Sequence, residues 1–137
     1  MDVLAEMADY PHRLTESVRF SETDQMGHVN NTVFGIYFEV GRTAYFCDNG
    51  FYRQSALGLV IVKTEINFRS MIHWPGSVEI GTRVASAGRS SFVMEQVLRQ
   101  DDRLAGSAVS IMVVIDLATN RSTAIPDEIR SGLRLPC

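Results

Sequence analysis

A long run of mostly apolar residues without proline, at positions 31–49, limits the possible folds of this chain more than any other feature. It reads NTVFGIYFEVGRTAYFCDN. Its apolar side chains are too many for one narrow helical stripe, and a helix that is apolar nearly all round is a buried helix. Gly50, directly after Asn49, is typical of a left-handed cap at a helix end. The sequence therefore predicts one long buried helix that the rest of the chain has to cover.

Two glycines lie inside this predicted helix, Gly35 and Gly41. A glycine inside a helix costs roughly 1 kcal/mol relative to alanine. That cost is easier to explain if another backbone passes very close. We therefore expect a close approach at both positions.

Most of the remaining chain alternates apolar and polar residues with the period of a β-strand. Short turns containing glycine, proline or paired aspartates separate these segments. Turns of hairpin length join antiparallel strands, and a run of strands beside one helix indicates the α+β class. The predicted strands are residues 14–22, 59–69, 77–86, 91–100 and 105–117, the last of them apolar on both faces and therefore central.

The length of 137 residues suits a single domain. Residues 1–12 are expected to be a loose lead-in, and the segment IPDEIRSGL near the end is expected to contain a last helical turn. One sheet and one helix leave strand edges and part of an apolar helix uncovered. We therefore expect a homodimer that extends the sheet edge to edge, with dimers pairing into a tetramer.

Net charge, apolar stretches and cysteine content indicate which kinds of partner and which cellular compartment to expect. The formal net charge is −3, whereas nucleic-acid-binding domains usually carry a basic excess. The N-terminus lacks the basic and apolar segments of a signal peptide, and no stretch of about 18 apolar residues predicts a membrane span. Cys47 and Cys137 do not form a disulfide framework, and we interpret both as free thiols of a cytoplasmic protein.

The segment in front of the predicted helix, residues 21–34, reads SETDQMGHVNNTVF. Asp24 is expected to end a strand, Gly27 permits a tight turn, and Asn30 or Asn31 is a suitable N-cap. A helix N-terminus has unused N–H groups and a partial positive charge, so it is able to stabilise a developing oxyanion. Acyl transfer also needs a group that attacks the carbonyl or activates water, and a carboxylate a few residues earlier would supply it.

The same residue types also form a common structural joint. Aspartate and glycine in a turn, followed by an asparagine cap, require no catalytic role. His28 alone is more often a turn residue than a general base. Residue types alone therefore leave both interpretations open.

A longer pattern extends this segment. Residues 24–31, DQMGHVNN, are followed in the predicted helix by Tyr37, Glu39 and Arg42. The pattern resembles the hot-dog-fold acyl-CoA thioesterases, and most of all their 4-hydroxybenzoyl-CoA thioesterase-like branch. The resemblance runs from about residue 14 to the tail IPDEIRSGL, and it implies one long helix wrapped by an approximately five-stranded antiparallel sheet. A tyrosine often found after the motif in that branch is Phe34 here.

The resemblance implies a role for each residue of the motif. Asp24 would either attack the thioester carbonyl to give a mixed anhydride or act as general base on water. The backbone N–H groups of Gly27, His28 and Val29 would polarise the thioester oxygen, in an active site built between two subunits. The side chains that would shape the pocket or place water are those of His28, Asn30 and Asn31.

The helix residues of the pattern have their own implied roles. Tyr37 would bind substrate, and the role of the tyrosine hydroxyl missing at Phe34 would be either absent or taken over by Tyr37. Glu39 and Arg42, at i and i+3, form at most a weak intrahelical pair, so we interpret them as charges that tie the helix to the sheet or to a second subunit. Another hot-dog branch uses a helix glutamate catalytically, which makes Glu39 a second candidate carboxylate. The aromatic residues expected in the pocket wall are Phe34, Tyr37, Phe51 and Tyr52.

A polar turn at residues 88–91, GRSS, resembles a segment that lies near the CoA arm of the thioester in such relatives. The planar guanidinium of Arg89 suits phosphate, and Ser90 and Ser91 add hydroxyl groups. A plain hairpin turn explains the same residues, so both interpretations stay open.

The sequence predicts neither a metal site nor a cofactor. Its three histidines are scattered without the spacing of metal ligands, and it contains no G-x-S-x-G nucleophile elbow. The leading hypothesis is an acyl-CoA thioesterase that hydrolyses its substrate to a free acid and CoA. Two alternatives stay open: a hot-dog dehydratase or hydratase, and a non-catalytic acyl-CoA-binding dimer.

Overall fold

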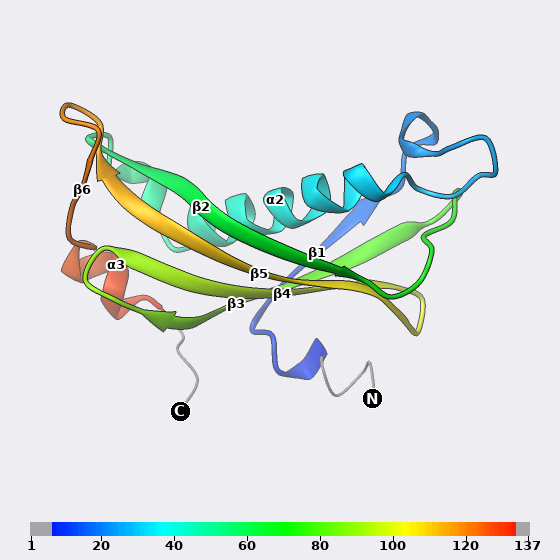
Figure 1. Cartoon of the computed structure of the whole chain (residues 1–137). Helices are drawn as coiled ribbons and strands as arrows, with labels where there is room; N and C mark the ends of the chain where they lie inside the picture. The colour runs from blue at the N-terminus through cyan, green and yellow to red at the C-terminus, as the bar shows by residue number, and fades with distance from the viewer. Residues whose placement is uncertain (1–6, 134–137) are drawn as a thin grey trace.

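Alternating apolar and polar residues build an antiparallel sheet that curves along the long helix α2 (Asn31–Asp48) (Figure 1). The computed structural model describes residues 7–133. Neighbouring strands follow the order β1–β3–β4–β5–β2, and a two-residue strand, β6, pairs with the end of β5. The predicted α+β class, with one long helix against an antiparallel sheet, is confirmed. The other elements are β1 (His12–Ser17), η1 (Phe20–Glu22), η2 (Phe51–Arg53), β2 (Leu57–Phe68), β3 (Ser77–Ala87), β4 (Ser91–Gln100), β5 (Arg103–Asp116), β6 (Arg121–Ser122) and α3 (Asp127–Ser131).

Helix α2 begins and ends where the sequence predicts. The side chain of Asn30 accepts a 3.0 Å hydrogen bond from the N–H of Thr32, and so satisfies one of the donors that a helix start leaves free. Beyond the last helical residue, Asp48, Gly50 has a φ of +84°. This left-handed conformation is the cap expected of a glycine at that position.

The sheet covers one face of α2, so the prediction of burial nearly all round is wrong for the single chain. Phe34, Phe38 and Phe46 are at most 1% exposed and belong to the two main core clusters. Ile36, in contrast, is 53% exposed, and Glu39 is also exposed. Part of the helix surface is therefore open to a further partner.

Only one of the two helix glycines has a close neighbour. A Cβ atom on Gly41 would lie 2.6 Å from Ile80 Cγ2 and 2.8 Å from Gln96 Nε2, so the missing side chain lets α2 approach β3 and β4. A Cβ atom on Gly35 would meet Ile66 Cδ1 at an ordinary contact distance of 3.9 Å. The predicted close approach is wrong for Gly35, and at Gly41 it involves side chains rather than another backbone.

The first strand is shorter than the predicted range of 14–22. β1 ends at Ser17, and the chain forms the 3₁₀ turn η1 where the strand was expected to continue. This turn is closed by Glu22, whose Oε1 accepts a 2.8 Å hydrogen bond from the N–H of Arg19. Asp24 therefore follows a turn and does not end a strand.

Part of the predicted lead-in is packed. Met7 and Tyr10 are 2% and 8% exposed and form a small apolar cluster with Val97. His12 already belongs to β1. The prediction of a loose segment is thus wrong for residues 7–12, whereas residues 1–6 lie outside the described part of the chain.

Strand β2 forms an exposed edge of the sheet. Its alternation breaks at a bulge between Ile61 and Lys63, and Val60, Ile61 and Val62 are 40%, 40% and 59% exposed. Strand β3 follows β2 in the sequence but is separated from it by β4 and β5. Residues 69–76 therefore carry the chain across the sheet, and the expected hairpin at this point is wrong.

The later strands form the two predicted hairpins, β3–β4 and β4–β5, with β5 between two neighbours. The predicted helical turn near the end is α3. Cys47 is a free, exposed thiol, whereas Cys137 lies outside the described residues. Within residues 7–133, none of the helices combines the length and hydropathy needed to cross a membrane.

Candidate active site

Asp24 lies in a tight turn between η1 and α2. Its N–H donates to the carbonyl of His28 at 2.7 Å, and its carbonyl accepts from the N–H of Gly27 at 3.2 Å. Gly27 has a φ of +76°, a conformation that glycine adopts without steric cost. Outside this turn, Thr23 and Val29 form an antiparallel bridge. The short segment from Thr23 to Val29 is thus a small closed hairpin.

The carboxylate of Asp24 is held by the backbone of its own turn. Oδ1 accepts hydrogen bonds from the N–H groups of Met26 at 2.8 Å and His28 at 3.2 Å. The Met26 N–H is the main cause that holds the pKa of Asp24 below its ordinary value, and the His28 N–H adds to it. The side chain is solvent-exposed, and its second oxygen makes no hydrogen bond within the described chain. Asp24 is therefore ionised at neutral pH and has one oxygen free.

The three N–H groups expected to polarise the thioester oxygen already have acceptors inside the chain. Those of Gly27 and His28 donate to Asp24, and that of Val29 donates to the carbonyl of Ile72 at 2.8 Å. The expectation of free donors at these three residues is therefore wrong for the single chain. Among the described residues, the first helical N–H of α2, that of Asn31, has no acceptor.

The N–H groups of the residues next to Asn31 all have acceptors within the chain. Asn30 N–H donates to the carbonyl of Glu22 at 2.9 Å, and Val33 N–H donates to the carbonyl of Asn30 at 2.9 Å. Thr32 N–H is capped by the Asn30 side chain. Because Asn31 comes first in the helix, it has no intrahelical acceptor. One backbone donor thus remains available at the helix start that follows Asp24.

A second segment, residues 72–76, fixes the turn from outside. His28 and His73 form an antiparallel bridge, and their rings meet edge to face with centroids 4.8 Å apart. The side chain of Gln100, at the end of β4, accepts from the His73 N–H and donates to the His73 carbonyl, both at 2.8 Å. Gln100 is 4% exposed, so a buried amide holds the segment that supports the Asp24 turn.

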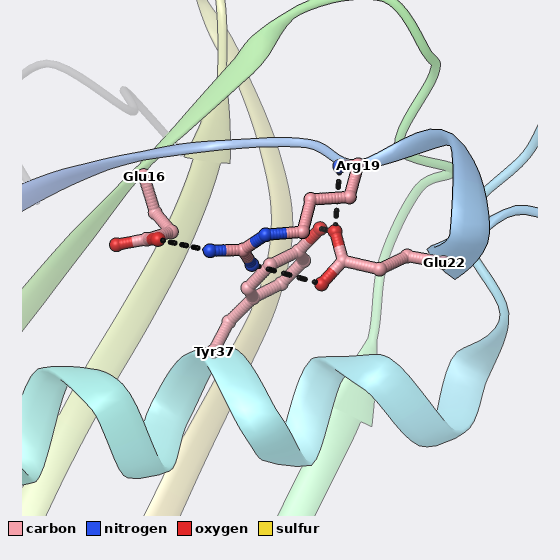
Figure 2. Close-up of polar contacts among 4 residues, drawn as sticks. All are labelled: Glu16, Arg19, Glu22 and Tyr37. Carbon is pink, nitrogen blue, oxygen red and sulfur yellow. Dashed lines mark hydrogen bonds and ion pairs between the residues drawn. The ribbon is translucent and has the colours of Figure 1, made fainter.

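Tyr37 occupies a different position from the predicted one. Its ring is 1% exposed, and its hydroxyl donates to Glu22 Oε1 at 2.7 Å rather than facing a pocket. Arg19 lies between Glu22 and Glu16, at 3.5 Å and 3.3 Å from their carboxylates (Figure 2). Burial, followed by the Glu22 carboxylate, raises the pKa of Tyr37 well above its ordinary value. The expected role of Tyr37 in substrate binding is therefore replaced by a tie between α2 and η1.

Glu39 and Arg42 lie on a different part of the helix. They line a hollow of 190 Å³ between α2 and β2, and Tyr52 lines it as well. Asp24 does not line this hollow. Of the aromatic residues expected in the pocket wall, only Tyr52 lines it, since Phe34 and Phe51 belong to the apolar core.

The predicted CoA-binding turn is rigid but distant from Asp24 along the sheet. The carbonyls of Arg89 and Ser90 accept from the N–H groups of Ile125 and Val114, each at 2.8 Å. Ser91 begins β4 and Gln100 ends it, so the two ends of this strand are roughly 30 Å apart. Because Gln100 is at the end near the Asp24 turn, the single chain does not bring residues 89–91 and Asp24 together.

Metal-binding groups do not gather at this site. Across residues 7–133, no group of three or more His, Cys, Asp or Glu side chains is arranged to hold a metal ion.

Comparison with known proteins places this geometry in a family. The model of the thioesterase-like superfamily matches residues 18–133. The chain belongs to this superfamily. Its curved sheet and single long helix are the hot-dog fold of these thioesterases, as the resemblance of residues 24–31 implied.

Individual relatives agree with this assignment. The PA5185 protein of Pseudomonas aeruginosa strain PAO1 superimposes with a TM-score of 0.84 at 25% identity, over 93% of this chain and 92% of that one. A thioesterase from Thermus thermophilus, solved in complex with coenzyme A and Zn, gives a TM-score of 0.79 at 30% identity, over 91% and 92% of the two chains. The uncharacterized protein YsmA of Bacillus subtilis is 26% identical over 121 residues, which is 85% of this chain and 81% of YsmA.

Proposed function

We propose that the protein is an acyl-CoA thioesterase that hydrolyses a thioester to the free acid and CoA, with Asp24 as its essential carboxylate. The observation that carries this proposal is the position of Asp24, ionised and with one free oxygen, in a rigid turn just before the free N–H of Asn31. The Thermus thermophilus thioesterase to which the chain is similar binds coenzyme A, which supports a CoA ester as substrate.

Each group has a chemical task in this reaction. As nucleophile, Asp24 would form a bond to the thioester carbonyl carbon, the C–S bond would break, and CoA would leave as a thiolate that then takes up a proton. Water would afterwards hydrolyse the mixed anhydride. As general base, Asp24 would instead take a proton from water as the water oxygen bonds to the carbonyl carbon; the C–S bond would then break, and the CoA thiolate would take up a proton. In both routes the Asn31 N–H would donate to the oxyanion, aided by the partial positive charge of the helix start.

We propose further that each active site lies between two subunits of a homodimer, and that two dimers form a tetramer. Asp24 and the CoA-binding candidates Arg89, Ser90 and Ser91 are at opposite ends of the sheet in one chain, so one substrate would reach both groups only across a subunit boundary. The exposed edge of β2 offers the unpaired backbone that edge-to-edge sheet extension needs. Two chains in a cytoplasmic dimer would thus supply one site.

The remaining motif residues would support this site. His28 would place the attacking water, since its backbone is fixed on both sides by Asp24 and His73. Gly27 and Val29 would hold the turn rather than the substrate, whereas the exposed side chains of Asn30 and Asn31 would border the bound thioester. Glu39 remains a second candidate carboxylate, at the hollow next to β2.

The decisive experiment is a thiol-release assay of Asp24→Asn on acyl-CoAs of different chain length and on aryl-CoAs. We expect kcat/KM on the best substrate to fall by about 10²-fold or more, the usual contribution of a general base or nucleophile. Asp102→Asn, in an exposed turn, is the matched control. Wild-type kcat/KM in Asp24→Asn would overturn the assignment of Asp24.

Other outcomes of the same screen distinguish the alternative functions. Saturable binding of acyl-CoAs without thiol release by the wild type would indicate a binding protein. Hydration of an enoyl-CoA without thiol release would indicate a hydratase. An acyl adduct on Asp24, detected by mass spectrometry after rapid quenching, would favour the nucleophilic route over the general-base route.

A further inference from the structure

At the Asp24 turn, three segments of the chain lie side by side, and each contributes an ionisable side chain. Asp24 lies opposite His28 across the small hairpin, since its N–H donates to the His28 carbonyl at 2.7 Å and its Oδ1 accepts the His28 N–H at 3.2 Å. His28 in turn forms an antiparallel bridge with His73. Opposite residues of neighbouring antiparallel segments have Cα atoms about 4.5–5.5 Å apart, so the row from Asp24 to His73 spans roughly 10 Å.

The side chains of this row are also close to one another. The rings of His28 and His73 are in edge-to-face contact, with centroids 4.8 Å apart and an angle of 72° between their planes. Although the Met26 N–H is the main cause of the lowered pKa of Asp24, a positive charge on His28 lowers that pKa as well. The His28 ring therefore lies close to the Asp24 carboxylate on one side and contacts the His73 ring on the other.

The backbone of His73 is fixed, whereas its imidazole is free. The buried Gln100 side chain bonds both the N–H and the carbonyl of His73 at 2.8 Å, and the N–H of Trp74 donates to the carbonyl of Gly27 at 3.2 Å. His73 itself is exposed, and its ring nitrogens make no hydrogen bond within residues 7–133. A rigid backbone thus presents an imidazole with two unused nitrogens beside the proposed catalytic turn.

The proposed thioesterase reaction leaves the source of one proton unassigned. When the C–S bond breaks, its electron pair goes to sulfur, and the CoA thiolate has to take up a proton. In the nucleophilic route Asp24 is ionised before it bonds to the acyl group, so it has no proton to give. The Asn31 N–H stabilises the oxyanion by a hydrogen bond and keeps its proton. Histidine is the side chain that enzymes use most often for proton transfer, because an imidazole exchanges its proton near neutral pH.

We propose that His73 is the general acid of the thioesterase reaction, an assignment that rests on the proposed function. The protonated imidazole transfers an N–H proton to the departing sulfur, directly or through one water, while the C–S bond breaks. The products of this transfer are the CoA thiol and a neutral imidazole. Because the ring is exposed, it then takes up a proton from solvent. Asp24 thus acts on the carbonyl carbon, and His73 acts on the sulfur bonded to that carbon.

The effect of His73→Gln on two leaving groups tests this assignment. A general acid assists the release of an alkyl thiolate such as CoA, but it contributes little to the release of 4-nitrothiophenolate, which is stable without a proton. We expect kcat/KM to fall about ten-fold or more on the best acyl-CoA, and by less than about three-fold on the S-(4-nitrophenyl) thioester of the same acyl group. A purely structural role of His73 would lower both values equally.

His12→Gln is the matched control for this substitution. The His12 ring bonds Asp48 at 2.7 Å, and Asp48 is the last residue of α2, at the opposite end of the helix from Asn31. His12 is therefore far from the Asp24 turn, and its replacement should change kcat/KM on neither thioester.

Rescue by free imidazole is a second measurement, and it needs only the acyl-CoA. Imidazole in the buffer should raise the kcat of His73→Gly several-fold, because it occupies the space of the missing ring and donates a proton in its place. It should leave Asp24→Asn unchanged. The proposal is overturned if imidazole does not rescue His73→Gly, or if His73→Gln keeps the wild-type kcat/KM on the acyl-CoA. Equal losses of His73→Gln on the two thioesters would overturn it as well.

The same assays separate a failure of this assignment from a failure of the proposed function. A fully active His73→Gln together with an inactive Asp24→Asn would overturn the role of His73 alone. A wild-type protein that releases no thiol from any acyl-CoA would overturn both the role of His73 and the proposed thioesterase function.

Discussion

The hydroxyl of Tyr37 donates a 2.7 Å hydrogen bond to Glu22 and thereby ties the middle of α2 to the turn that leads into Asp24 (Figure 2). Glu22 also accepts the N–H of Asn30 through its carbonyl. One residue thus connects the centre of the helix, its N-terminus and the approach to the proposed catalytic carboxylate. This arrangement makes the stability of the turn depend on a contact two helical turns away.

Removal of the Tyr37 hydroxyl should destabilise the protein. A hydrogen bond to a charged acceptor contributes about 1.5–3 kcal/mol, so Tyr37→Phe should lower the free energy of unfolding by about 1.5 kcal/mol. Urea denaturation measures the change. Tyr52→Phe, at a tyrosine that is 54% exposed, should change it by less than about 0.5 kcal/mol. Equal effects of the two substitutions would mean that the Glu22 contact is not stabilising.

The same tyrosine should make stability dependent on alkaline pH. Burial and Glu22 raise the pKa of Tyr37 in the folded state above the ordinary value of 10.0. A raised pKa contributes stability that is fully present below pH 10 and is lost as pH rises through and beyond that value. The difference in unfolding free energy between the wild type and Tyr37→Phe should therefore shrink between pH 9.5 and pH 11.5. A constant difference over this range would contradict the linkage.

Protonation of Asp24 should not reduce thioesterase activity in the neutral pH range. Its pKa lies below the ordinary value of 3.8, chiefly because of the Met26 N–H, so the carboxylate stays ionised until the pH falls below that value. We expect kcat/KM for thiol release to show no inflection from Asp24 between pH 5 and pH 8. An acidic inflection above pH 5 that moves in Asp24→Glu, but not in the control Asp102→Glu, would contradict this prediction.

Sequence reasoning located the proposed catalytic turn but not the groups that hold it. Residues 24–31 contain the carboxylate, the left-handed glycine and the N-cap, and each of these depends on near neighbours, so a local pattern is enough to find them. Gln100 supports the turn from 76 positions further along the chain. No local pattern marks that contact, because it depends on the crossing of the sheet by residues 69–76.

The difference between local patterns and contacts distant in sequence also explains the wrong predictions for helix α2. A pattern of apolar residues predicts burial, but not which faces are covered by the chain's own sheet and which are left open. In the sequence, Arg42 is one half of an i, i+3 pair with Glu39, yet in three dimensions its partner is Gln96, 54 positions away. The free N–H of Asn31 could have been found from the sequence, since the first helical N–H never has an intrahelical acceptor.

Removal of the Gln100 amide should affect activity as well as stability. Gln100→Leu removes the hydrogen bonds of the Gln100 amide to both the N–H and the carbonyl of His73, and each such bond contributes about 0.5–1.5 kcal/mol. We expect the unfolding free energy to fall by about 2 kcal/mol and the kcat for thiol release to fall more than ten-fold. The control Gln25→Leu changes an exposed glutamine next to Asp24. A Gln100→Leu enzyme that is destabilised but keeps its full kcat would mean that the amide is structural only.

The two glycines of α2 offer a matched pair of substitutions with opposite expected signs. Gly41→Ala places a Cβ atom 2.6 Å from Ile80 Cγ2 and 2.8 Å from Gln96 Nε2, and overpacking of a buried site costs typically about 1–3 kcal/mol. Gly35→Ala meets only Ile66 Cδ1 at 3.9 Å, so the higher helix propensity of alanine should raise stability by roughly 0.5–1 kcal/mol. Thermal and urea unfolding of both variants measure the difference. Similar stabilities for the two variants would contradict the close packing of α2 against β3 and β4.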